Sequence, residues 1–259
     1  MSESQSVGGG SPAVGSAPPG GAPSAEPMSI PEACFSIFFA PSRVFAERQG
    51  KGWVLPLIIL TVLISLVFFG ARPYMQPAID AEMARATAAV MRANPQLTAA
   101  QMQAGRAMQE KFGAVVVVVI IPVTVVAIGF TLWLVGRFVE SKQSLRAAFV
   151  VATFAYFPRL LAWPASGVIA VVRDPSHLTG LYNLTLGPGY FLDLTTASPI
   201  LIALVGRLDV FIVWTTVLLA IGLHVTGKVP KGQAYIVAAI MWIIGAVPGL
   251  FGALRTAGS

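Results

Sequence analysis

The sequence predicts an all-α membrane protein: a polytopic transmembrane helical bundle with five spans, a cytoplasmic N-terminal tail and an interfacial helix. The first reason is composition, because 56% of the 259 residues are hydrophobic and only 11% are charged, whereas soluble domains carry roughly 25% charged residues. The second reason is a pair of apolar runs, Gly113–Val135 without a charge and Ala147–Val172 with only Arg159 charged. Each run exceeds the roughly 20 apolar residues of helix that cross a hydrocarbon core.

The chain begins with a tail, residues 1–28, in which 17 of the first 27 residues are Gly, Pro or Ser. Such a composition buries too little apolar area to offset the entropy lost on ordering, so we expect the tail to be disordered. It has no basic residue ahead of an apolar core and does not read as a signal peptide.

A short amphipathic segment precedes the first span. Ser29 and Glu32 fit a capping box, and phenylalanines then recur at roughly helical spacing, with basic residues around them: Phe35, Phe38, Phe39, Phe45, Arg43, Arg48 and Lys51. This pattern favours a helix that lies in the headgroup plane. The alternative is a helix packed on the cytoplasmic ends of the spans.

The membrane domain is expected to occupy residues 29–254, followed by a short tail at 255–259. The predicted spans are residues 53–71, 113–135, 147–172, 210–226 and 233–254. Residues 72–112 read as a helical hairpin outside the membrane, because Asn94-Pro95 breaks an Ala-rich helix and Thr98 can cap the next one. Pro199–Leu208 reads as a further short apolar helix.

The distribution of basic residues predicts the orientation. One set of short segments carries Arg43, Arg48, Lys51, Arg137, Lys142, Arg146, Lys228 and Lys231. The opposite side has Arg173 and Arg255, plus five cations spread through the long hairpin. We therefore expect a multi-pass protein of the cytoplasmic (inner) membrane, with its N-terminus cytoplasmic and its C-terminus outside.

Arg159 and Asp209 form a candidate intramembrane ion pair. Arg159 lies near the centre of the third span, where a charge costs roughly 2.5–3.5 kcal/mol, and Asp209 opens the fourth span, with Arg207 as a competing partner. A functional interpretation places the pair on a binding or permeation surface. The alternative is a structural role: Pro158 breaks the helix, and Arg159 donates hydrogen bonds to the carbonyls that the break leaves free or extends toward the membrane surface.

Other polar features give weaker signals. The position of His224 near the end of the fourth span favours a structural role at the helix end over a role in a proton relay. Asn183-Leu-Thr185 matches a glycosylation sequon. We find no catalytic motif, no metal site and no cofactor site, so the sequence does not predict an enzyme. The net charge of +6 resides mostly in loops beside the spans and does not predict nucleic-acid binding.

Three stretches carry a resemblance to a known family. They are Phe39-Ala-Pro-Ser-Arg-Val-Phe45, then Gln143-Ser-Leu-Arg-Ala-Ala-Phe149 leading into Ala155-Tyr-Phe-Pro158, and Leu208-Asp-Val-Phe-Ile-Val-Trp214. In the order of these stretches and in the number of its spans, the chain resembles the bacterial branch of the Yip-domain family. These are five-span membrane proteins named for interaction with Ypt/Rab GTPases. The Asp-Leu-Tyr-Gly-Pro stretch of eukaryotic relatives is absent, so GTPase recognition does not follow from the resemblance.

The resemblance implies a non-enzymatic scaffold or adaptor that organises membrane or recruits protein partners. Its partners would be the lipid bilayer and an unknown protein, and a homo-oligomer is left open. The main alternative is a small-solute or ion transporter, or a transporter subunit, that uses Arg159 and Asp209. An internal repeat would favour transport, and the sequence shows no clear one.

Overall fold

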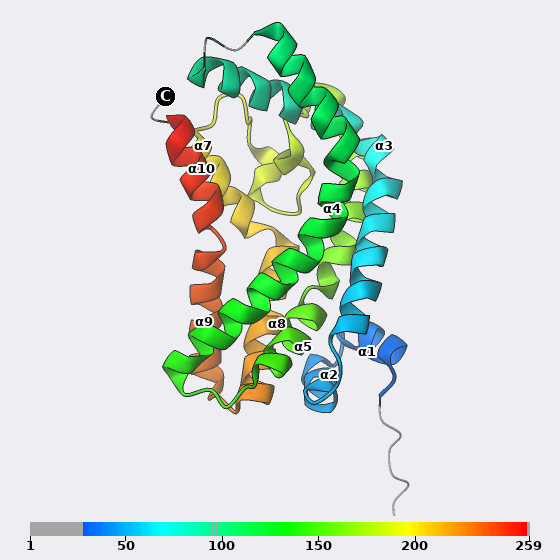
Figure 1. Ribbon diagram of the computed structural model, residues 1–259, viewed down its shortest axis with the longest axis vertical. Coiled ribbons are helices and arrows are strands. Elements are labelled where there is room, and N and C mark those ends of the chain that lie inside the picture. The colour runs from blue at the N-terminus through cyan, green and yellow to red at the C-terminus, as the bar shows by residue number, and fades with distance from the viewer. Residues whose placement is uncertain (1–27, 95, 97, 258–259) are drawn as a thin grey trace, which may run out of the picture.

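The computed structural model describes residues 28–94, 96 and 98–257, and the regular elements among them are all helices (Figure 1). Five segments are long and apolar enough to cross a membrane: Val54–Arg92, Lys111–Val139, Leu145–Val172, Val210–Gly227 and Lys231–Leu254. The predicted all-helical, five-span fold is therefore confirmed. The predicted tail lies, apart from Met28, outside the described residues.

Two short helices precede the first span. Helix α1 (Ile30–Ser36) begins at Ser29, whose hydroxyl accepts a hydrogen bond from the Glu32 amide at 3.3 Å. Helix α2 (Pro41–Arg48) buries Val44 and Phe45 beneath the end of the bundle, against α8 and α5. On α1 and just after it, Phe35 and Phe39 remain 69% and 75% exposed. Helix α2 thus packs on the ends of the spans, while α1 presents an exposed apolar side at the same end.

The first two spans belong to two very long helices, α3 (Val54–Ala93) and α4 (Ala99–Gly136). At 1.5 Å per residue each has a length along its axis of ~60 Å, about twice the hydrocarbon thickness. The helix of the first span does not end at Ala71, as the sequence suggested, but runs on through Pro73 and Pro77. The predicted hairpin is the continuation of the two spans, and Thr98 forms the expected capping box with Gln101.

The third span is broken near its middle. Helix α5 (Leu145–Ala155) gives way to a 3-10 turn, η2 (Phe157–Leu161), and then to α6 (Ala162–Val172). The break coincides with Pro158, which has no backbone N–H to continue the α-helical pattern. Pro164 lies in the first turn of α6, where its missing N–H costs nothing, and it does not break the span.

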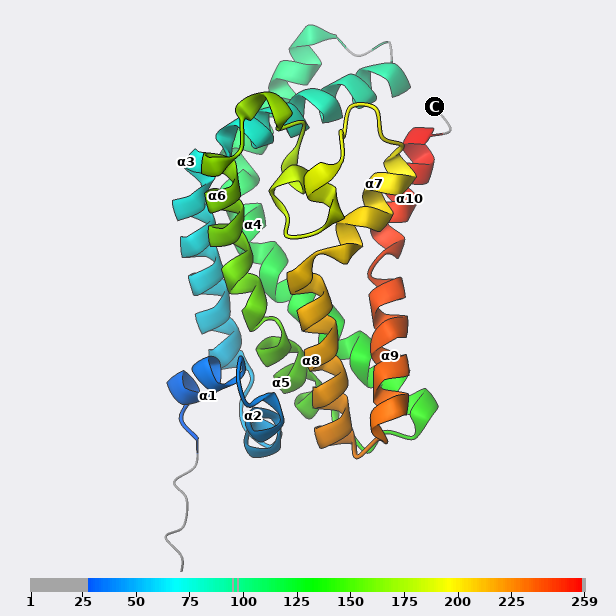
Figure 2. The same cartoon turned by 180° about the vertical axis from the view of Figure 1, so that it is seen from behind.

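A layer of turns and one short helix connects the third and fourth spans. It consists of η3 (Pro175–His177), η4 (Leu181–Leu184), η5 (Pro188–Phe191), α7 (Pro199–Val205) and η6 (Gly206–Leu208). Figure 2 shows the turns of this segment between α3 and α6 on one side and α7 with α10 (Val247–Ala257) on the other. A separate apolar cluster, formed by Met75 and Ala78 of α3 with Leu178 and Leu184, attaches it to the upper part of α3.

The last two spans are α8 (Val210–Gly227) and the pair α9 (Lys231–Ile244) and α10. The fifth span breaks at Gly245-Ala246, and Pro248 is the second residue of the helix that follows. The principal core joins α2, α3, α4, α5, α8 and α9 around fully buried side chains such as Phe154 and Leu223.

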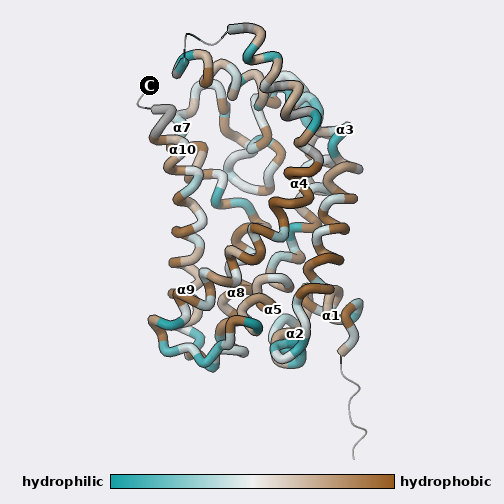
Figure 3. The backbone as a smooth tube through the Cα atoms, viewed as in Figure 1, coloured by the Kyte–Doolittle hydropathy of each residue, from teal (hydrophilic) through white to brown (hydrophobic). Residues whose placement is uncertain are grey.

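The basic end of the bundle is fastened by two turns that touch each other. The turn after η1 (Arg137–Val139) and the end of α8 are linked because the Lys142 amide donates to the Gly227 carbonyl at 3.0 Å. The buried Gln143 side chain also donates to the Thr226 hydroxyl at 2.6 Å. Figure 3 shows polar residues gathered at this end below the apolar middle of the helices.

Candidate functional site

Arg159 is placed by the break in the third span. The 3-10 turn η2 is held by the Arg159 amide, which donates to the Tyr156 carbonyl at 3.0 Å. The turn carries the guanidinium group into the interior, where it lies 5.8 Å from the centre of the Tyr156 ring. Its side chain is 32% exposed and is therefore only partly buried in the bundle.

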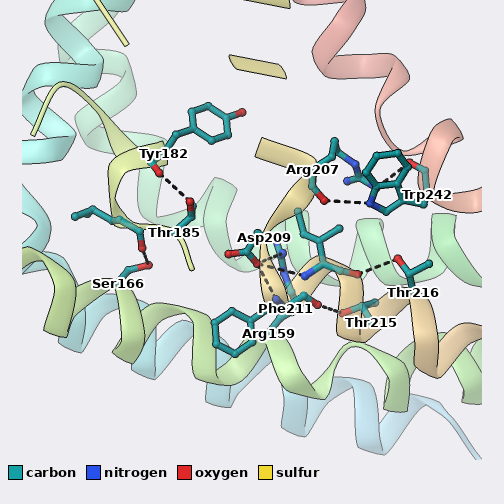
Figure 4. A network of polar contacts seen from close by, with 12 residues as sticks. Arg159, Ser166, Tyr182, Thr185, Arg207, Asp209, Phe211, Thr215, Thr216 and Trp242 are labelled. Carbon is teal, nitrogen blue, oxygen red and sulfur yellow. Dashed lines mark hydrogen bonds and ion pairs between the residues drawn. The ribbon is translucent and has the colours of Figure 1, made fainter. Parts of the chain in front are cut away.

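The structure brings Asp209 to Arg159 (Figure 4): Oδ1 of Asp209 lies 3.9 Å from Nη1 of Arg159. The same oxygen accepts hydrogen bonds from the amides of Phe211 at 2.9 Å and Ile212 at 3.3 Å. Asp209 is therefore the N-cap of α8, where a carboxylate is favoured by free amides and by the helix dipole. Its closest polar partners are these amides, and the arginine is a longer-range neighbour.

Arg207, the competing partner in the sequence, instead points to the break between α9 and α10. Its Nη2 donates to the Trp242 carbonyl at 3.0 Å, and the Trp242 indole N–H donates back to the Arg207 carbonyl at 3.0 Å (Figure 4). A cation at the C-terminal end of α9 is placed where the helix dipole favours it. The Arg207 Nε is buried and has no hydrogen-bond partner.

Arg159 and Arg207 both line a crevice of about 450 Å³ between α4, η2, α8 and the α9–α10 break. Its walls are largely apolar, and hydroxyl groups come from Thr124 and Thr131 of α4 and from Thr215 and Thr216 of α8. Asp209 is not among the described residues that line this crevice.

Sequence reasoning identified Arg159 and Asp209 but missed the wall that α4 contributes. Thr124 and Thr131 are seven residues apart and so lie on one face of a helix, two turns from each other. That spacing of two hydroxyl residues within an otherwise apolar span indicates a polar side of α4 and can be found in the sequence. The contact between Arg207 and Trp242 joins residues 35 positions apart, and local patterns do not report it.

The weaker candidates have structural roles. His224 lies at the basic end of α8 with Nδ1 2.6 Å from the Val229 carbonyl, as a helix-end histidine would. The Asn183 sequon is not an available acceptor in this fold, because Asn183 is fully buried. Its amide nitrogen donates to the Gly189 and Leu192 carbonyls, and its oxygen accepts from Thr179. Asn183 organises the outer layer.

A comparison of the sequence with known protein families shows a match to the Yip1 domain over residues 35–252. The matched region runs from α1 to α10 and includes Arg159, Arg207 and Asp209. No curated protein and no solved structure matches the sequence.

Proposed function

The chain belongs to the Yip1 domain family, and from that premise we propose that it is a non-enzymatic scaffold or adaptor of the bacterial branch. In this proposal the five spans hold the protein in the bilayer. The extramembrane hairpin of α3 and α4 recruits a protein partner.

The observation that carries the proposal is the length of the hairpin. Connections between helices in bundles usually take about 2–8 residues, whereas here 72–112 lie between the predicted ends of the first two spans. The part of α3 that belongs to the hairpin also contacts the rest of the protein, because the Leu181 amide donates a hydrogen bond to the Glu82 carboxylate at 3.4 Å. A helical hairpin of this length exceeds what joining two spans requires.

The surface near the hairpin tip indicates the chemistry of the partner. Val90 and Met91 on α3 are each 48% exposed, and Met108 on α4 is 62% exposed. Methionine side chains adapt to irregular apolar surfaces. We therefore infer that the partner is a protein that presents an apolar patch outside the membrane.

The proposed location is the inner membrane, with the N-terminus in the cytoplasm and the C-terminus outside. The support is that α1, α2, the turn after η1 and the turn after α8 lie together at one end (Figure 1). The eight cations that the sequence assigned to the cytoplasmic side lie in these segments or close to them along the chain. Basic residues flanking spans favour that side.

Site-specific photo-crosslinking in intact cells tests the adaptor proposal. A photoreactive residue at Met91 or Met108 should give one discrete adduct with another protein. The matched control is Val119, which is 52% exposed within the apolar part of α4 and should give lipid adducts only. An adduct of twice the mass of this chain, or none from either hairpin position, would contradict the proposal.

The transporter alternative draws less support from the geometry. It requires Arg159 and Asp209 to share a path for the solute. Arg159 lines the crevice, but the Asp209 oxygen nearest to it already accepts from two backbone amides. The crevice therefore fits a binding site better than a two-charge permeation path.

A further inference from the structure

The crevice between α4, α8 and the α9–α10 break has an excess of positive charge. Arg159 and Arg207 both line it, and the described salt bridge of this pair joins Arg159 to Asp209 at 3.9 Å. That carboxylate is also engaged by two amides of α8. Of the two guanidinium groups, only that of Arg159 has a carboxylate partner among the described salt bridges, and an unmatched charge inside an apolar bundle is costly.

The role of Arg207 as a helix cap does not account for its whole guanidinium group. Its Nη2 donates to the Trp242 carbonyl at 3.0 Å, but its Nε is buried without a hydrogen-bond partner. A buried donor left unpaired costs free energy that a ligand could recover. An oxyanion suits this position, because guanidinium groups bind carboxylates and phosphates through paired N–H donors.

The size and walls of the crevice fit a ligand that is mostly apolar. Ligand pockets typically have volumes of about 300–1,000 Å³, apolar walls and a few convergent polar groups, and this crevice has about 450 Å³. Ala127 and Ile128 of α4 and Met241 of α9 belong to its apolar wall.

The crevice opens sideways, toward the space that lipid would occupy. Val123 on α4 is 55% exposed and Ile244 at the end of α9 is 41% exposed, and both line the crevice. Arg159 lies halfway along the third candidate span, Leu145–Val172. A ligand that enters from the bilayer can therefore reach the guanidinium groups without crossing the bundle.

We propose that this crevice binds an anionic amphiphile, with its phosphate or carboxylate group between Arg159 and Arg207 and its hydrocarbon chain against α4 and α9. The anion supplies the negative charge that the site lacks. The two arginines in turn balance the negative charge of a headgroup that water solvates poorly at this depth. This inference does not depend on the hairpin or on its partner.

Thermal unfolding of the purified full-length protein in detergent tests the inference. Phosphatidylglycerol should raise the melting temperature saturably, and phosphatidylcholine of the same chain length should not. Arg207→Gln should weaken the apparent affinity for phosphatidylglycerol by ~10-fold or more, because a charge-assisted contact is lost. The matched control is Arg92→Gln, an exposed arginine on the hairpin, which should bind like the wild type.

A second variant keeps the inference testable if Arg207→Gln unfolds. Ala127→Phe fills the crevice from α4 at an exposed position and leaves both arginines in place. It should abolish the stabilisation by phosphatidylglycerol while the protein without lipid stays folded. Equal stabilisation by the two lipids, or undiminished binding to Ala127→Phe, would overturn the inference. Stabilisation by inorganic phosphate alone, lost in the same variants, would replace the amphiphile by a free anion.

Discussion

Asp209 combines two interactions that point in different directions through one oxygen. Toward α8 it caps the helix, with the Phe211 amide 2.9 Å away. Toward the third span it faces Arg159 at 3.9 Å, near the limit for an ion pair. The cap requires only a side-chain oxygen, whereas the interaction with Arg159 requires a negative charge. Substitutions can separate the two.

Asp209→Asn should leave the cap in place, because Asn and Asp are similarly good N-cap residues, and should remove only the charge. The resulting destabilisation should be partly recovered by adding Arg159→Leu, with a coupling free energy of about 0.5–3 kcal/mol in a double-mutant cycle. The measurement is unfolding in detergent. Asp209→Ala should cost about 1 kcal/mol more, because the cap is lost as well. Strictly additive effects would show that Arg159 does not depend on Asp209.

At the scale of elements, α5 and α8 approach each other closely because Gly222 of α8 faces Val151 of α5. A Cβ atom at Gly222 would lie 2.9 Å from Cγ2 of Val151 and closer still to Cγ1. Val151 is fully buried, so it has no free direction in which to move. Small residues at helix contacts are typical of membrane bundles.

Gly222→Ala should therefore destabilise the protein by about 1–3 kcal/mol, the usual cost of overpacking. A second change, Val151→Ala, should restore much of the lost stability by making room. The comparison variant is Gly70→Ala in α3, where a Cβ atom would have no neighbour within 4 Å; its effect should stay within about 1 kcal/mol. If the two alanine variants unfold alike, the close contact does not determine the packing.

The sequence predicted the elements that local chemistry controls. Uncharged length identified the spans, Thr98 with Gln101 identified the start of α4, and Pro158 identified the break in the third span. The continuation of α3 beyond Ala71 was missed, because Arg72 and two prolines resemble a helix end. Packing of Met75 and Ala78 on the outer layer accompanies the continued helix, and that contact depends on residues about 100 positions later.

For the candidate site, the sequence supplied Arg159 and Asp209 but not the crevice. A charge within an apolar span is visible locally, and so is an acid at the start of a helix. The walls come from four parts of the chain that only the tertiary fold brings together. The same holds for Asn183, which matches a glycosylation sequon in the sequence but whose side-chain amide holds the outer layer together in the structure.

The molecule as a whole has two different ends, and the orientation prediction can be tested on them. Ser42→Cys on α2 and His177→Cys in η3 each place a thiol at an exposed position. In intact cells an impermeant maleimide should label His177→Cys and not Ser42→Cys. Ser42→Cys should be labelled only after the membrane is permeabilised. The reverse pattern would invert the proposed topology.

The native Cys34 should interfere little with this measurement. Burial raises the pKa of its thiol to about 11, and the nearby Arg48 only partly opposes that effect. Near pH 7 the thiol is therefore almost entirely protonated, and the thiolate is the form that reacts. Wild-type protein should remain essentially unlabelled at neutral pH even after permeabilisation, which provides the baseline for both variants.

The bend in α3 turns the outer part of the hairpin into a cover for the bundle. Pro73 and Pro77 lie inside the helix, and proline in a helix interior bends the helix axis. The part beyond Ala71, about 33 Å long at 1.5 Å per residue, therefore turns across the end of the bundle and over the layer that connects the third and fourth spans (Figures 1 and 2). Because α3 is one helix on both sides of the bend and packs against α6, a change in the tilt of the first span would shift this cover over the layer beneath it.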